Sequence, residues 1–247
     1  RFTPIKTIFL TGHMLWWFPF VLVAGGVEAG LKGTMLVIVS AVLSAIYWSV
    51  MPWIMRKYVW DATGDDSFLI GHPTGILSLI SGFIAKRVEN KARSTEDLNI
   101  PESLSFFREI SITGGLVMFL MNLVVGVIAP VLIPDGGNLV MFAIEAGLNF
   151  GAGLLIMLYG VRLLINQIIP AFQGIAEKVV PGAKPAFDVP ILFNYRPNAV
   201  IIGFIVAMIT STVLVIVVNS FDLFGILIVP LVITSFFECG GAAVIGE

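Results

Sequence analysis

The chain has 247 residues, of which 57% are hydrophobic and 12% charged, with a formal net charge of -2. The single cysteine, Cys239, excludes an intrachain disulfide framework and a cysteine-based metal site. The sequence contains no GxxxxGK[ST] loop and no basic stretch interleaved with aromatic residues, so it indicates neither an ATP-driven pump nor a nucleic-acid partner. This composition predicts an all-α polytopic membrane protein, because a soluble protein of this size cannot cover several long apolar helices.

Charge-free apolar runs define the expected spans in chain order. A helix rises about 1.5 Å per residue, so about 20 apolar residues cross a hydrocarbon core of about 30 Å. The mixed stretch Asn166–Val180 instead predicts a helix on the membrane surface. Because the chain begins at Arg1 and ends at Glu247 inside an apolar stretch, we expect a fragment of a larger membrane protein, cut at both ends. The candidate spans are Thr7–Ala29, Gly33–Met55, Ile110–Ile133, Leu139–Leu164, Asn198–Asn219 and Leu223–Phe236.

The positions of lysine and arginine predict the orientation of these spans. Acidic and basic residues concentrate in residues 86–109, which we expect to form a cytoplasmic loop. The connections Pro134–Asn138 and Asn219–Asp222 contain neither lysine nor arginine and are placed outside. Lys32 is the exception to this pattern.

Two apolar segments, residues 68–85 and 181–197, do not fit as spans. Each lies between cytoplasmic connections and is interrupted by glycine or proline, so it must return to the side from which it entered. Irregular backbone at membrane depth is tolerated only inside protein or beside a water-filled cavity, and such segments point to a transporter's substrate site. We interpret both as re-entrant hairpin segments, with surface amphipathic helices as the alternative.

Histidines and carboxylates within apolar segments are the candidate site residues, since ionisable groups there are costly and often functional. His13 in the first span and His72 in the first broken segment each follow a glycine. A neutral imidazole can donate and accept hydrogen bonds, which suits a polyhydroxylated ligand. Asp188, in the second broken segment, could accept from sugar hydroxyls or hold a proton. The alternatives are a helix–helix hydrogen bond for each histidine and a helix cap for Asp188.

Three further residues are weaker candidates. Glu145 lies early in the fourth span, where a place near the outer interface would also explain it. Glu238 begins a Gly-rich apolar stretch that we interpret as a third turn. Trp17 lies one helical turn from His13, either to stack on a ligand ring or to join the aromatic belt. We expect no catalytic residue, metal site or cofactor.

Several stretches, in chain order, are together similar to one family. They resemble the ascorbate-type permeases, the membrane IIC component of the phosphoenolpyruvate-dependent sugar phosphotransferase system. The resemblance implies a homodimer with an interface domain and a moving core domain, of which this chain (1–247) is part of a single permease domain. It also implies cytoplasmic IIA and IIB partners and a multi-pass location in a bacterial inner membrane. The stretches are Lys6–His13, Phe68–His72, Ser94–Leu98, Gly160–Arg162, Ala171–Ile175, Val180–Ala183, Asp188 and Pro197–Val200.

The chain differs from the ascorbate-using members of this family at three places where those members carry glutamine. Members that use ascorbate carry Gln-Gln directly after the Ile-Gly-His motif, where this chain has Pro73-Thr74, and again four residues after the Thr-Gly-His histidine, where it has Trp17-Phe18. Glu145 replaces a further glutamine. Losing amides that pair with a hydroxylated lactone argues against ascorbate itself and for a related sugar or polyol. The expected substrate contacts are His13, His72, Asp188, Thr74, Trp17 and Glu238.

The leading hypothesis is therefore a phosphotransferase-system permease domain that carries a small hydroxylated carbohydrate to a IIB partner. It would sit among membrane lipid and perform no covalent chemistry itself. An ion-coupled secondary transporter of the same architecture is the alternative, with Asp188, Glu145 or Glu238 as proton carrier. A structural or assembly subunit is the third hypothesis, and it would give the broken segments and histidines no purpose.

Overall fold

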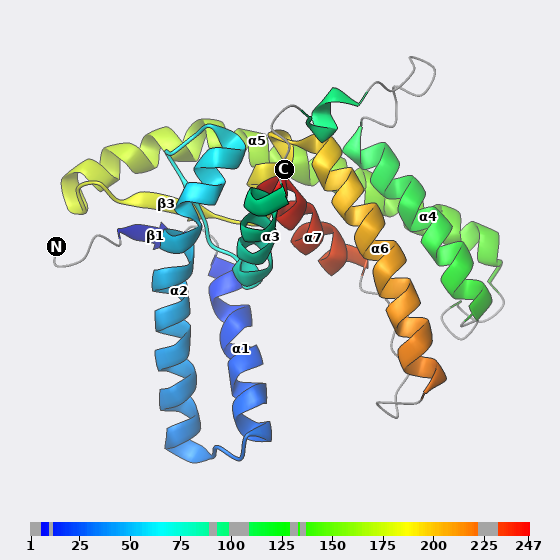
Figure 1. Ribbon diagram of the computed structural model, residues 1–247, viewed down its shortest axis with the longest axis horizontal. Helices are drawn as coiled ribbons and strands as arrows, with labels where there is room; N and C mark the ends of the chain where they lie inside the picture. The colour runs from blue at the N-terminus through cyan, green and yellow to red at the C-terminus, as the bar shows by residue number, and fades with distance from the viewer. Residues whose placement is uncertain are drawn as a thin grey trace.

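The computed structural model describes residues 6–9, 12–88, 93–98, 109–128, 133, 137–221 and 232–247. Most of these residues are helical (Figure 1). Within this described part, four helices are long and apolar enough to cross a membrane, which confirms the predicted all-α polytopic membrane class. They are α2 (Gly33–Thr63), α4 (Ile110–Ile128), α5 (Leu139–Val179) and α6 (Pro197–Ser220).

One arm of the molecule is the hairpin of α1 (Gly12–Glu28) and α2 (Figure 1). The turn between them passes through Gly30 and Gly33, whose φ angles of 84° and 54° favour glycine. The first helix is shorter than the predicted span Thr7–Ala29, because Thr7–Phe9 form strand β1. Their backbone groups bond to a neighbouring strand, which removes them from the helix.

The second arm contains α4, α6 and the first half of α5 (Figure 1). Here α4 and α5 meet at backbone contact: a Cβ added to Gly115 would lie 2.8 Å from the Gly147 carbonyl oxygen. Small residues allow this close approach between membrane helices. The predicted end of the span at Leu164 is wrong, because α5 continues to Val179 as one helix. The stretch predicted as a separate surface helix is its second half, which reaches over to β3 (Figure 1).

A small parallel sheet joins the first arm to the rest of the molecule. Its order is β1–β3–β2, where β2 is Leu69–Ile70 and β3 is Lys184–Phe187. The two segments interpreted as re-entrant therefore each begin with a strand. In the first, β2 leads through a tight turn into α3 (Gly75–Val88); in the second, β3 leads into the short 3-10 helix η4 (Val189–Asn194). The sequence analysis did not anticipate this sheet.

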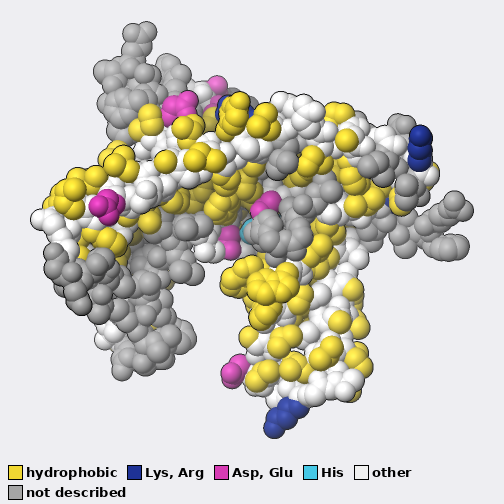
Figure 2. Space-filling model, turned by 180° about the vertical axis from the view of Figure 1, so that it is seen from behind, with side chains coloured by type: hydrophobic (Ala, Val, Ile, Leu, Met, Phe, Trp, Pro, Cys, Tyr) yellow, Lys and Arg dark blue, Asp and Glu magenta, His cyan; other side chains and the backbone are white. Residues whose placement is uncertain are grey.

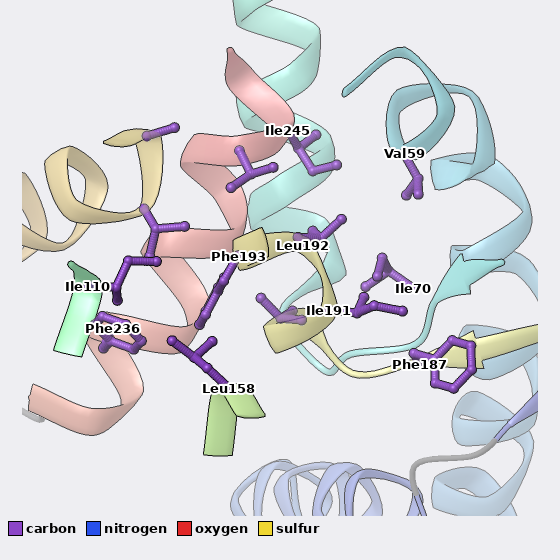
Figure 3. Close-up of a cluster of buried hydrophobic side chains, with 14 of the residues drawn as sticks. Val59, Ile70, Ile110, Leu158, Phe187, Ile191, Leu192, Phe193, Phe236 and Ile245 are labelled. Atoms are coloured by element: carbon purple, nitrogen blue, oxygen red, sulfur yellow. The ribbon is translucent and has the colours of Figure 1, made fainter. Parts of the chain in front are cut away.

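The buried core surrounds η4 (Figure 3). Ile191 and Leu192 of η4 face Ile70 on β2, while Phe193 points toward helix α7 (Val232–Gly246). The Phe193 ring lies 5.2 Å from that of Phe236, edge to face, an arrangement that aromatic pairs prefer. These contacts fix η4, and with it the end of β3.

The Gly-rich stretch after Phe236 is not a turn, which corrects the interpretation given to Glu238. Residues 232–246 form α7, and the start of the last predicted span, at Leu223, lies outside the described residues. The glycines are explained by packing: a Cβ at Gly240 would lie 3.0 Å from Val200, and one at Gly241 would collide with Val189. Small residues here let α7 approach α6 and η4 closely.

Candidate functional site

The ends of β2 and β3 bring the two broken segments together. The register pairs Leu69 with Ala186 and Ile70 with Phe187, and the Gly71 amide donates to the Phe187 carbonyl at 2.8 Å. Because both strands run in the same direction, the residues that follow them emerge at the same edge. A Cβ at Gly71 would collide with the ring of Phe9, so this close approach requires glycine.

His72 and Asp188 are the residues placed at this edge. The His72 Nε2 atom lies 3.6 Å from Asp188 Oδ1, longer than a direct hydrogen bond. His72 is 5% exposed, whereas the Asp188 side chain is 21% exposed. Figure 2 shows histidine and acidic side chains at the base of the recess between the two arms. Of the two side chains, the Asp188 carboxylate is therefore the one that is accessible from the surface.

The turn after β2 sets the proton position on the His72 ring. The Thr74 backbone N–H donates to His72 Nδ1 at 3.2 Å, and the Thr74 hydroxyl lies 2.6 Å from the same nitrogen. A nitrogen that accepts an amide hydrogen bond carries no proton in the neutral ring. Neutral His72 thus carries its proton on Nε2, which faces the Asp188 carboxylate.

Asp188 also caps η4. Its Oδ1 accepts from the Val189 N–H at 2.7 Å, and Pro190 follows at the start of the helix, where its missing N–H costs nothing. The capping alternative considered from the sequence is therefore real. It is compatible with the contact to His72, since a carboxylate has several acceptor positions.

The other predicted contacts do not join this pair within the described residues. His13 lies in the first turn of α1, but its side chain is outside what the structure describes. Trp17 is 59% exposed on α1, as a residue of the aromatic belt would be. Glu238 is half-buried in α7, and Glu145 is exposed on α5. Thr74 acts on the His72 ring rather than toward Asp188.

Tyr47 is a site residue that the sequence analysis missed. Its hydroxyl lies 3.0 Å from the His72 carbonyl oxygen and 2.5 Å from that of Pro73. The Tyr47 ring stacks on Phe18 of α1, with ring centroids 4.1 Å apart. A tyrosine in an otherwise apolar span was the available signal, because its hydroxyl must find a partner there.

A second polar cluster lies at the end of α7 and consists of Ser94, Thr95, Arg196 and Glu247; we call it the Glu247 cluster. The Glu247 carboxylate accepts from both hydroxyls at 2.5 Å and from the Thr95 N–H at 2.6 Å. Arg196 approaches it to 3.7 Å. Burial opposes ionisation of Glu247, but these hydrogen bonds and the guanidinium outweigh it and hold its pKa below the usual range.

A separate cleft of about 380 Å³ opens at the end of α2. Both of its carboxylates have a cation: Asp66 pairs with Lys184 at 3.1 Å, and Asp61 pairs with Lys86 at 2.6 Å. Neither His72 nor Asp188 lines it. Among the described residues, no group of three histidine, cysteine or acidic side chains is placed to hold a metal ion. The lining residues are Arg56, Lys57, Trp60, Asp61, Asp66, Phe68, Leu69 and Lys184.

Comparison with known proteins places this chain in a family. Residues 1–247 match the EIIC-GAT family, described as the sugar-specific permease component of the PTS system. A curated relative, the ascorbate-specific PTS system EIIC component of Mycoplasma pneumoniae, is 26% identical over 99% of the chain. The chain spans about 44% of the length of that relative. This chain belongs to the PTS sugar-specific permease family, as its resemblance to the IIC permeases predicted.

Proposed function

We propose that this chain is the substrate-binding part of a phosphotransferase-system permease, in which the His72–Asp188 pair contacts the hydroxyl groups of a small carbohydrate. The observation that carries the proposal is the 3.6 Å separation of His72 Nε2 and Asp188 Oδ1 at the ends of β2 and β3. The imidazole N–H offers a donor and the carboxylate offers an acceptor, both facing the same point. Substrate hydroxyls can accept from the first and donate to the second.

The substrate class follows from the few polar groups that meet at this point. The relative from Mycoplasma pneumoniae is named as ascorbate-specific. In this chain Pro73-Thr74 follows His72, and the Thr74 hydroxyl contacts the His72 ring. An amide at that place would instead offer both a donor and an acceptor to a lactone. We therefore propose a sugar or polyol related to ascorbate as the substrate.

Transport is proposed to depend on the two broken segments. Residues 68–85 and 181–197 would act as re-entrant elements that carry the His72–Asp188 pair in a moving core. This core would deliver the carbohydrate to a cytoplasmic IIB protein for phosphorylation, and a IIA protein would supply the phosphate to IIB. The remaining proposed contacts are His13, Thr74, Trp17 and Glu238. The protein would work as a homodimer in a bacterial inner membrane, with residues 86–109 on the cytoplasmic side.

Uptake of radiolabelled ascorbate, pentitols and hexitols by cells that express the permease tests this function. We expect one compound to accumulate in phosphorylated form, and only in cells with an intact phosphoryl-transfer chain. Glu28→Gln, an exposed substitution on α1 away from the pair, serves as the control and should leave uptake unchanged. Accumulation of unmodified substrate in cells without the phosphoryl donors would overturn the proposal and favour ion-coupled transport. No accumulation of any compound would also contradict it.

A further inference from the structure

The turn that carries His72 is held from outside by the α1–α2 arm. The turn's own backbone bonds involve His72 and Thr74: the Gly75 N–H donates to the His72 carbonyl at 3.1 Å, and the Leu77 N–H donates to that of Thr74 at 2.8 Å. Tyr47 adds a bond from α2 that reaches both the His72 and Pro73 carbonyls. One phenol therefore links two consecutive peptide units of the turn.

The position of the Tyr47 hydroxyl is itself fixed on two sides. Phe18 stacks on its ring at 4.1 Å with an interplanar angle of 27°, and Trp48 contacts it edge to face at 5.4 Å. Below the turn, a Cβ on Gly75 would lie 2.8 Å from Met51 and 3.3 Å from the Tyr47 hydroxyl. The missing side chain at Gly75 is thus what lets α2 come close enough for the phenol to reach the turn.

We infer that Tyr47 is a positioning residue for the substrate site: by holding the His72–Pro73 carbonyls it keeps the Thr74 amide on His72 Nδ1 and directs the Nε2 proton toward Asp188. This inference rests on the proposed function of the His72–Asp188 pair. Tyr47 acts through the histidine and not on the carbohydrate. Without the hydroxyl, the turn relaxes, the Thr74–Nδ1 bond weakens, and both neutral forms of the ring become populated.

Nitrogen-15 NMR of the histidine rings tests the inference without any substrate. The chain contains two histidines, so His72→Ala assigns the two sets of signals in the detergent-solubilised protein. We expect wild-type His72 to show the form protonated at Nε2. Tyr47→Phe, which keeps the ring stack, should shift both His72 nitrogens toward averaged values. Unchanged His72 signals would overturn the inference, whether or not a carbohydrate ligand is found.

Binding of the transported carbohydrate gives the second measurement. Tyr47→Phe should weaken affinity about 10-fold, a middle value for the loss of one hydrogen bond. In the His72→Ala background the same substitution should change affinity less than about 2-fold, because its effect passes through the ring. An equal loss in both backgrounds would show that Tyr47 acts on the substrate directly and would refute a positioning role.

Two variants keep the test decisive. Tyr58→Phe is the matched control, because Tyr58 also lies on α2 and packs its ring against α3 at Gly82. It should leave both the NMR signals and affinity unchanged. Gly75→Ala inserts a methyl group between α2 and the turn and should displace the Tyr47 hydroxyl from it. If Tyr47→Phe does not fold, the shift of the His72 signals in Gly75→Ala decides, and its absence counts against the inference.

Discussion

The His72–Asp188 pair and the Glu247 cluster use similar side chains but differ in how their carboxylates are satisfied. Glu247 accepts three hydrogen bonds of 2.5–2.6 Å from Ser94 and Thr95. Asp188 Oδ1 accepts a hydrogen bond from the Val189 N–H at 2.7 Å and faces a buried imidazole N–H at 3.6 Å, beyond direct hydrogen-bonding distance. A carboxylate filled by short bonds ties segments together, whereas a donor and an acceptor held slightly apart can both be used by a ligand.

The two clusters also differ in what surrounds them. The Glu247 cluster joins elements far apart in sequence. Glu247 directly follows α7, Arg196 precedes α6, and Ser94 caps the 3-10 helix η1 (Thr95–Asp97), which Thr95 begins. Next to it, Glu96 accepts from the Asn198 and Ala199 amides at 2.9 and 3.2 Å and so caps α6. The Glu247 cluster should therefore control the stability of the fold, and the His72–Asp188 pair should control substrate binding.

The largest expected effect is on stability, from Glu247→Ala. The substitution strands two hydroxyls, an amide and part of the Arg196 charge, which should cost about 3 kcal/mol. Thermal unfolding in detergent should show a midpoint roughly 6–12 °C lower. Glu28→Ala, at an exposed position on α1, is the control and should change little. An unchanged unfolding midpoint in Glu247→Ala would show that the Glu247 cluster does not stabilise the fold.

The next effect is on binding, from His72→Ala. Loss of the ring removes one partner from a desolvated pair, which should cost about 1–3 kcal/mol, or roughly 5- to 150-fold in carbohydrate affinity. Isothermal titration should detect the loss, while the unfolding midpoint should move less than in Glu247→Ala. If His72→Ala aggregates, the histidine has a structural role. If the variant folds and binds with unchanged affinity, His72 does not belong to the substrate site.

Acid should weaken the Glu247 cluster in a defined direction. The pKa of Glu247 is lower in the folded state than in the unfolded chain, so its contribution is complete above the ordinary glutamate pKa. The contribution is lost as the pH falls through the lower, folded-state value, where the folded carboxylate also binds a proton. Unfolding midpoints measured against pH should fall less steeply on the acid side for Glu247→Gln than for wild type. Identical profiles would contradict this role.

The smallest expected effect is from Tyr195→Phe. The Tyr195 hydroxyl lies 3.4 Å from Asp65, a long contact at partly exposed groups. Burial and the charge of Asp65 raise the pKa of Tyr195, so its phenol should stay neutral well above neutral pH. Its removal should cost about 0.5 kcal/mol or less. If Tyr195→Phe lost as much stability as Glu247→Ala, the contact between Tyr195 and Asp65 would also be important for the stability of the fold.

Part of the candidate site was predictable from the sequence because its residues interrupt apolar segments. His72 stands between a glycine and a proline, and Asp188 lies two residues before a proline, so both are ionisable groups in apolar segments that glycine or proline interrupts. Tyr47 is marked only as a tyrosine in an apolar span, which indicates that its hydroxyl needs a partner but not which partner. Its role depends on which face of α2 meets the turn before α3, and that depends on contacts between helices.

The sequence alone determined the membrane class, most of the helices and the family, because apolar runs of sufficient length can hydrogen-bond their backbone only as helices in lipid. Tertiary structure decided the rest. Strands β1, β2 and β3 contain two to four residues each and pair across more than a hundred positions of the chain, so no local pattern specifies them. That pairing places His72 beside Asp188. Close packing of α7 against its neighbours explains the glycines that we interpreted from the sequence as a turn.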